Sequence, residues 1–141
     1  MNNSPILFNS EGFLEQPLDL KKLLTPHPDF TYFVRVEGES MRGAGLHPGD
    51  ILVVDRTLDV VNHAIVVVQF NGGFLVKRIQ LEGQTIVLLS EHPRYPMITV
   101  TSQDDLVQWG VVTFCLHPVK AQRPHGPIVA SHNPQQRKTL R

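Results

Sequence analysis

The strongest constraint on the fold is the segment Asn71-Gly72-Gly73, which separates two apolar runs. Asn-Gly tolerates the positive φ angles of a tight turn, so it predicts a β-hairpin that joins residues 64–70 to residues 74–79. Similar short apolar runs bounded by turn residues recur at 31–36, 51–54, 85–89, 98–101 and 107–116. Seven short strands with little helix predict an all-β domain, folded as a single twisted barrel or folded-over sheet.

The two ends of the chain differ from this β-rich part, which we assign to residues 31–120. Residues 1–30 are expected to be a flexible, polar N-terminal arm, in which several leucines before Pro26 predict a short helical turn at 18–24. Residues 121–141 carry four basic residues, no acidic residue and three prolines, and they lack apolar periodicity. This composition predicts a disordered, basic C-terminal tail.

Charge and composition exclude several classes of protein. The net charge is zero, but the tail contributes +4, so residues 1–120 sum to −4, which disfavours direct, specific nucleic-acid binding. No apolar run approaches the ~20 residues of a membrane span, and no secretory signal is recognisable. Cys115 is the single cysteine and the histidines lack ligand spacing, so we expect no disulfide, metal or cofactor and a cytoplasmic location. Cys115 itself is expected to be an inert buried thiol, with Trp109 and Phe114 in the core.

The first candidate for chemistry is Ser40, within Gly38-Glu39-Ser40-Met41. It follows a predicted strand on a loop, where its hydroxyl can be exposed. The backbone N–H groups of Glu39, Ser40 and Met41 are then candidates for binding an oxyanion. On its own, a serine after a strand is more often a turn residue.

The second candidate is Lys77, which lies between apolar residues in a predicted strand. Alternation places it on one face with Leu75 and Ile79, although such lysines usually extend to water. Apolar surroundings lower a lysine pKa, and only a neutral amine can act as a general base. Together the two residues predict a serine–lysine dyad in which Lys77 accepts the Ser40 proton during attack on a peptide carbonyl.

Three segments carry a resemblance to a known family: 37–41 (EGESM), 48–55 (PGDILVVD) and 76–78 (VKR). They resemble the LexA/UmuD family of self-cleaving serine–lysine peptidases, and most closely its UmuD branch in the shortened, activated form. The resemblance implies that Ser40 is the nucleophile and Lys77 the general base, on a β-rich twisted fold. It also implies a role in SOS mutagenesis after DNA damage, as a homodimer that serves a UmuC-like translesion DNA polymerase, with a RecA-type filament stimulating cleavage.

The chain departs from this family at its candidate cleavage bonds. UmuD-like proteins cut themselves at a Cys-Gly or Ala-Gly bond in the arm, whereas the only arm glycine, Gly12, follows Glu11. Ala44-Gly45 lies within the serine loop itself. We therefore expect no efficient self-cleavage of residues 1–141.

Two alternatives stay open at this point. One is a non-cleaving binding subunit with a vestigial dyad, and the other is a soluble signal-peptidase-like serine protease, which the missing membrane anchor disfavours. A LexA-type repressor is disfavoured because the 39 residues before Ser40 are too few for a helix-turn-helix domain with a linker.

Overall fold

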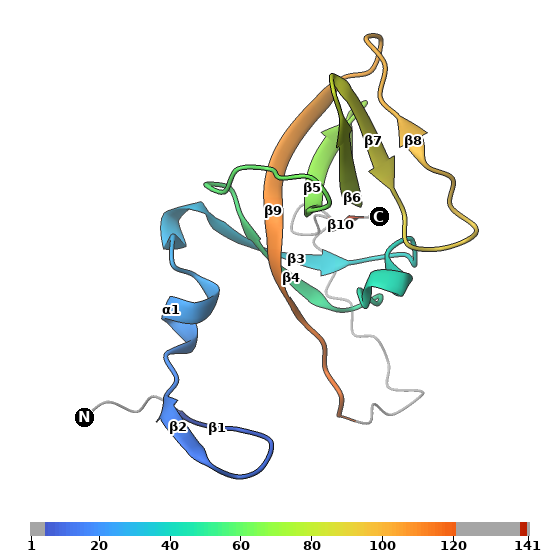
Figure 1. The fold of residues 1–141 in the computed structure, drawn as a ribbon. Helices are drawn as coiled ribbons and strands as arrows, with labels where there is room; N and C mark the ends of the chain where they lie inside the picture. Colours follow the sequence, from blue (N-terminus) through green and yellow to red (C-terminus); the bar gives the residue numbers. More distant parts are fainter. Residues whose placement is uncertain (1–4, 121–138, 141) are drawn as a thin grey trace, which may run out of the picture.

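The computed structural model of the chain describes residues 5–120 and 139–140 and is rich in β-strands (Figure 1). Its helical elements are short: α1 (Leu20–Leu24) and the 3₁₀ turns η1 (Pro28–Phe30) and η2 (Arg42–Ala44). The strands, in chain order, are β1 (Ile6–Phe8), β2 (Leu14–Pro17), β3 (Thr31–Val36), β4 (Ile51–Asp55), β5 (Ile65–Phe70), β6 (Gly73–Glu82), β7 (Thr85–Leu89), β8 (Ile98–Thr99), β9 (Leu106–Leu116) and β10 (Thr139–Leu140).

Seven of these strands form one curled sheet, a half-barrel, in the order β3-β4-β9-β5-β6-β7-β8. The long strand β9 joins its two parts, because it pairs with β4 near its end and with β5 near its start. The predicted all-β fold is confirmed. The short strand β10 adds to the outer edge of β3 in parallel; the rest of the tail expected to be disordered lies outside the described residues.

The predicted hairpin is the connection between β5 and β6. Asn71 and Gly72 both have positive φ angles, 48° and 86°, as a tight turn of this kind requires. Asn71 is also held by the loop before β9, since its side-chain amide donates to Asp104 at 3.0 Å and its amide oxygen accepts from the Asp105 N–H at 2.8 Å. The turn therefore aligns β6, the strand that carries Lys77, with β5.

Two apolar clusters lie on opposite faces of the sheet. Val67 and Val76 belong to one cluster, together with residues of β3, β4 and the serine loop. Val66, Val68 and Ile79 belong to the other, together with Leu88. The alternation predicted for β6 is thus confirmed, and it carries Lys77 on the same face as Ile79.

The end of β9 corrects one expectation. Trp109 packs against the core, but Phe114 is 38% exposed and lies outside it. Val53 pairs with Phe114 while Val54 pairs with Val112, so Thr113 is an extra residue, a β-bulge. The bulge reverses the alternation, and Cys115 packs on the core in place of Phe114.

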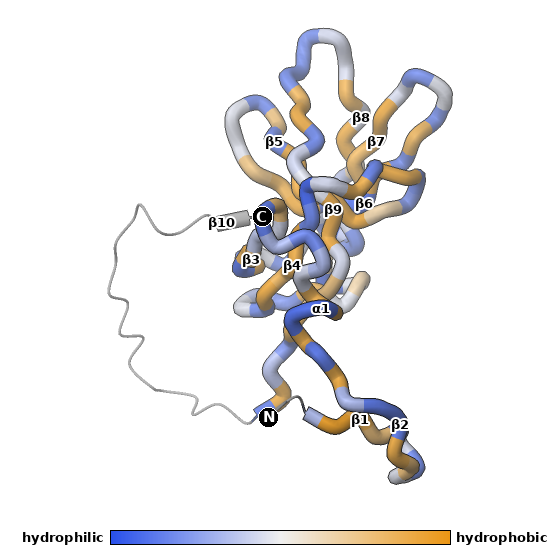
Figure 2. The backbone as a smooth tube through the Cα atoms, turned by 90° about the vertical axis from the view of Figure 1, so that its left-hand side faces the viewer, coloured by the Kyte–Doolittle hydropathy of each residue, from blue (hydrophilic) through white to orange (hydrophobic). Residues whose placement is uncertain are grey.

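The N-terminal arm contains more structure than expected. Strands β1 and β2 form an antiparallel hairpin that projects away from the half-barrel (Figure 2). Its apolar side chains are exposed, with Phe8 at 55%, Phe13 at 66% and Leu14 at 63%. The predicted helical turn is α1, and its N-cap is Asp19, whose side chain accepts from the Lys22 N–H. Within residues 5–120 and 139–140, no helix has the length and apolar character of a membrane span.

Candidate active site

Ser40 lies on a tightly closed loop between β3 and β4. The loop is closed at its base by the Val36 N–H, which donates to the Asp50 carbonyl at 2.8 Å, and by the Gly49 N–H, which donates back to Val36 at 2.9 Å. Next to Ser40, the side chain of Met41 is buried in the core with 2% exposed. The Ser40 residue is itself only 6% exposed, so the loop holds its position instead of leaving it in solvent.

Lys77 is buried in the middle of β6, with 5% of the residue exposed. Its Nζ donates a hydrogen bond to Ser90 Oγ at 2.7 Å and lies 5.5 Å from the centre of the Tyr95 ring. Burial disfavours the charged ammonium and lowers the pKa of Lys77 from its ordinary value. The desolvation expected from the apolar strand is therefore confirmed.

Two backbone hydrogen bonds connect the serine loop to the segment after β7. The Glu91 N–H donates to the Ser40 carbonyl at 2.8 Å, and the Gly43 N–H donates to the Glu91 carbonyl at 2.8 Å. Gly43 must be a glycine for this approach, because a Cβ there would lie 2.6 Å from the Glu91 oxygen. The segment next to Lys77 and the loop of Ser40 are thus one connected unit.

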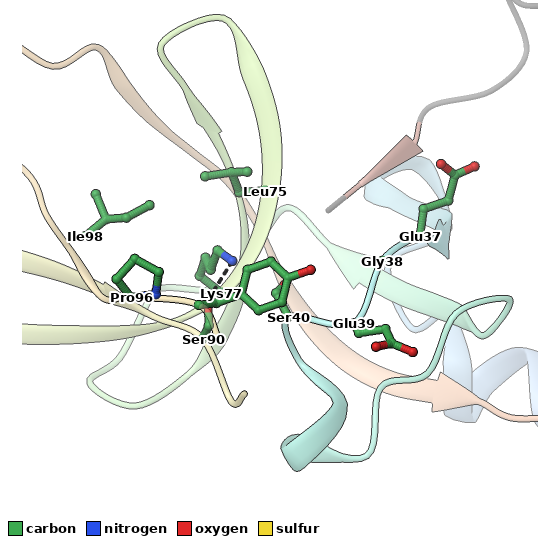
Figure 3. A pocket seen from close by; sticks show the side chains of 10 residues that line it. Glu37, Gly38, Glu39, Ser40, Leu75, Lys77, Ser90, Pro96 and Ile98 are labelled. Atoms are coloured by element: carbon green, nitrogen blue, oxygen red, sulfur yellow. Dashed lines mark hydrogen bonds between the residues drawn. The ribbon is translucent and has the colours of Figure 1, made fainter. Parts of the chain in front are cut away.

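Ser40 and Lys77 line the same cavity, which has a volume of about 400 Å³ (Figure 3). Much of its wall is apolar, with Leu75, Pro96 and Ile98 on one side. The acidic residues Glu37 and Glu39 lie at the other end. The full lining is Glu37, Gly38, Glu39, Ser40, Leu75, Lys77, Ser90, Tyr95, Pro96 and Ile98.

The structure brings the two predicted residues to one pocket, and it adds a third that sequence reasoning missed. The hydrogen bond of Lys77 is made with Ser90, so a direct bond between Ser40 and Lys77 stays a prediction. Ser90 has no local signal, since it is one serine after a strand and its contact depends on how β6 pairs with β7. Among residues 5–120 and 139–140, no hydrogen bond uses the backbone N–H of Glu39, Ser40 or Met41, the oxyanion candidates.

The cavity of this strand-rich half-barrel is thus lined by a nearly buried serine on a loop and a desolvated lysine, the combination predicted from the sequence for a serine hydrolase. Comparison with known proteins defines the family. Residues 2–113 match the family described as Peptidase S24-like, so the chain belongs to this serine peptidase family.

Curated relatives place the chain in the UmuD-type part of that family. It is 38% identical over 113 residues to protein MucA of Salmonella typhimurium, covering 78% of this chain and 77% of the relative. It is 38% identical over 109 residues to protein SamA of the same species, and the alignment covers 77% of this chain and 75% of SamA. It also matches the LexA repressor of Bordetella parapertussis at 38% over 108 residues, where it spans 77% of this chain but 49% of the repressor.

Proposed function

We propose that this protein is a UmuD-like SOS mutagenesis protein that cleaves a peptide bond in an extended segment of itself or of a second copy. Ser40 is the nucleophile and Lys77 is the general base. The observation that carries the proposal is that both residues line one largely apolar cavity, in which Lys77 is 5% exposed and has a lowered pKa.

The reaction follows from the chemistry of these two groups. The neutral Lys77 amine accepts the proton of Ser40 as Oγ forms a bond to the carbonyl carbon. The carbonyl oxygen takes up the negative charge, for which the backbone N–H groups of Glu39, Ser40 and Met41 are the proposed donors. The Lys77 ammonium then donates its proton to the leaving amine as the peptide bond breaks. A water molecule hydrolyses the resulting ester and restores Ser40.

The burial of Lys77 supports its role as a base. At an unperturbed lysine pKa of about 10.4, only about 0.1% of the amine is neutral near pH 7.5, which would make cleavage slow. A lowered pKa raises this fraction, and the rate should increase with pH until Lys77 is fully neutral. Such a dependence on alkaline pH is a property that a serine–histidine hydrolase would not share.

The arm conformation supports the expectation that residues 1–141 do not cleave themselves efficiently at Glu11-Gly12. Gly12 has a φ of 88°, and its N–H donates to the Asn9 carbonyl at 3.0 Å. The Asn9 side chain also accepts from the Glu11 N–H at 3.0 Å. The bond therefore lies in a closed turn, and the hairpin would have to open before the segment could extend into the cavity.

The proposed partners follow the family. We propose a homodimer to which the end of β9 contributes, since Phe114 and Leu116 expose apolar surface there, as does Phe33 on β3. Further proposed partners are a UmuC-like translesion DNA polymerase and a RecA-type filament that stimulates cleavage, all in the cytoplasm. The single cysteine of the chain, which is unpaired, fits such a reducing compartment.

The test uses Glu11→Ala, which creates an Ala-Gly bond in the arm. Intact mass spectrometry after incubation between pH 7 and pH 10, with and without a RecA-type filament, should show loss of residues 1–11. The double variants E11A/S40A and E11A/K77A are the controls and should stay intact. If E11A stays intact at every pH and the protein also fails to cleave an extended Ala-Gly peptide added in trans, while it still binds the polymerase, the dyad is vestigial and the non-cleaving alternative is correct.

A further inference from the structure

Ser90 is a polar residue of the cavity to which the family resemblance assigns no role. We propose that Ser90 is a positioning residue for the base: its Oγ accepts a hydrogen bond from Lys77 Nζ and thereby turns the amine toward Ser40. This inference rests on the proposed function, because it assumes that Lys77 is the base.

The contact is short and specific. Lys77 Nζ and Ser90 Oγ lie 2.7 Å apart, and this is the hydrogen bond that the structure gives to the amine within residues 5–120 and 139–140. Figure 3 shows Ser90 beside Lys77 on the wall of the cavity, with the bond drawn between them. The remaining neighbours of the amine include the Tyr95 ring and the apolar side chain of Leu75.

A neutral amine has two N–H groups and one lone pair, and only the lone pair can accept the serine proton. Without a polar partner, the amine would occupy its three staggered rotamers in an apolar cavity, and most of them would direct an N–H toward Ser40. Donation of one N–H to Ser90 fixes the rotation about the Cε–Nζ bond. The lone pair is then restricted to the two remaining staggered positions, and the proposal requires one of them to face Ser40.

The position of Ser90 is fixed relative to Ser40 itself. The next residue, Glu91, donates its N–H to the Ser40 carbonyl and accepts from the Gly43 N–H. Leu89, the residue before Ser90, pairs with Arg78 on β6. Ser90 is therefore held between the serine loop and β6. Its hydroxyl can fix the position of the proposed base, Lys77, relative to the proposed nucleophile, Ser40.

Two effects are expected when the hydroxyl is removed in Ser90→Ala. The cleavage rate at high pH, where Lys77 is neutral, should fall about tenfold, because the amine loses its orientation. The pKa of Lys77 should fall further, since the lost acceptor stabilised the ammonium more than the amine. Ser90→Thr retains the hydroxyl and should keep both properties.

The influence of the other charged and titratable groups around the amine must be distinguished from the effect of the Ser90 hydroxyl. They are Tyr95, whose ring faces Nζ, Glu37 and Glu39 at the end of the cavity, and the pair formed by Arg78 and Glu91. The matched control is Glu91→Gln, which weakens the ion pair on the same segment and leaves the Ser90 hydroxyl in place. It should change the melting temperature but leave the orientation of Lys77 intact.

The experiment combines two measurements on the full chain in the E11A background. Titration of the Lys77 side chain by NMR, assigned with K77R, reports its ionisation in S90A, S90T and E91Q. The pH profile of Ser40-dependent cleavage reports the plateau rate. A lowered titration midpoint and a lowered plateau in S90A, with both kept in S90T, are the expected results.

An unchanged midpoint and plateau in folded S90A would overturn the inference, as would an equal loss of activity in S90A, S90T and E91Q. Absence of cleavage in every variant, E11A included, would instead overturn the proposed function. The titration would then still decide whether Ser90 holds the amine, because it needs no substrate.

Discussion

The serine loop and the segment after β7 approach each other closely at Gly43, and Gly43→Ala tests how the site is held together. The added Cβ would lie 2.6 Å from the backbone oxygen of Glu91, whereas ordinary contact begins near 3.4 Å. The Glu91 carbonyl and the Gly43 segment must therefore separate by about 0.8 Å. Since the atom in the way is backbone, a change of side-chain rotamer cannot relieve the clash.

The expected loss of stability follows from this separation. Overpacking of this kind costs about 1–3 kcal/mol, and the hydrogen bond from the Gly43 N–H to Glu91 contributes about 1 kcal/mol more when it is stretched. A total near 3 kcal/mol should lower the melting temperature by roughly 9–15 °C in a domain of this size. Scanning calorimetry of G43A and the parent chain measures this change.

The same substitution should also reduce the cleavage rate. A displacement of about 1 Å between reacting groups can cost about 10²-fold in rate, and the same movement draws Ser40 away from the segment that contacts Lys77. Cleavage by the E11A/G43A variant should therefore fall by about two orders of magnitude at a temperature where the protein is still folded. Mass spectrometry against time gives this rate.

The control is Gly73→Ala, because a Cβ at Gly73 would meet its nearest atom at 3.7 Å, which is ordinary contact. This variant should match the parent chain in both measurements. The reasoning is refuted if G43A melts within 1 °C of the parent, or if it loses stability as expected but cleaves at the parent rate. In the second case the two halves of the site would be held by something other than this contact.

Four further predictions concern ionisable groups and assembly. Burial lowers the pKa of Lys77 below its ordinary 10.5, so the charged form of Lys77 destabilises the fold. K77M should therefore have a higher free energy of unfolding in urea than the parent chain at neutral pH. This gain should disappear as the pH rises to 10.5. Burial raises the pKa of Asp50, but hydrogen bonds from the His47 N–H, His117 and Cys115 outweigh this and lower it. Asp50→Asn should therefore lose about 2 kcal/mol at pH 7, a loss that shrinks as the pH falls below 3.8. Burial raises the pKa of Cys115 to about 11 from 9.0, so its alkylation at pH 8 should be about 10²-fold slower in the folded than in the urea-unfolded chain. Phe114→Lys should convert a sedimenting dimer to a 15.9 kDa monomer.

Each of these predictions has a contrary result. An equal gain in K77M at pH 7 and pH 10.5 would show that packing, not charge, causes it. A loss in D50N that persists at pH 2.5 would exclude the carboxylate as its source. Equal alkylation rates would mean that the thiol is not protected, and a dimer that survives F114K would move the interface elsewhere.

Local patterns were sufficient to predict most of the sheet. The turn at Asn71-Gly72 and the alternation of β6 determine which side of the strand Lys77 occupies, and both are visible in a few adjacent residues. The arm hairpin was missed because β1 and β2 are short and are bounded by Pro5 and Pro17. These signals are typical of irregular chain, and here the turn at Asn9 overrides them through side-chain hydrogen bonds.

From the sequence alone, Phe114 was misplaced and Ser90 was missed, because the positions of both residues depend on long-range strand pairing. Phe114 would face the core if β9 kept its alternation, but the bulge at Thr113 arises only from its pairing with β4. Ser90 reaches Lys77 because β7 pairs with β6 so that Leu89 lies opposite Arg78. No run of neighbouring residues encodes either arrangement, whereas Ser40 and Lys77 were predictable from their own surroundings and from the family resemblance.

The position of β9 in the sheet has a consequence for how the protein is made. Ser40 follows β3 and Lys77 lies in β6. Within the sheet of the described residues, β4 and β5 both pair with β9, the last strand of the half-barrel to be synthesised, and not with each other. A nascent chain on the ribosome can form the β3–β4 and β5–β6 pairs before residues 106–116 emerge, since domains fold as their segments become available. Until then Ser40 and Lys77 belong to separate parts of the sheet, so a polysome-bound chain should lack the complete cavity that both residues line.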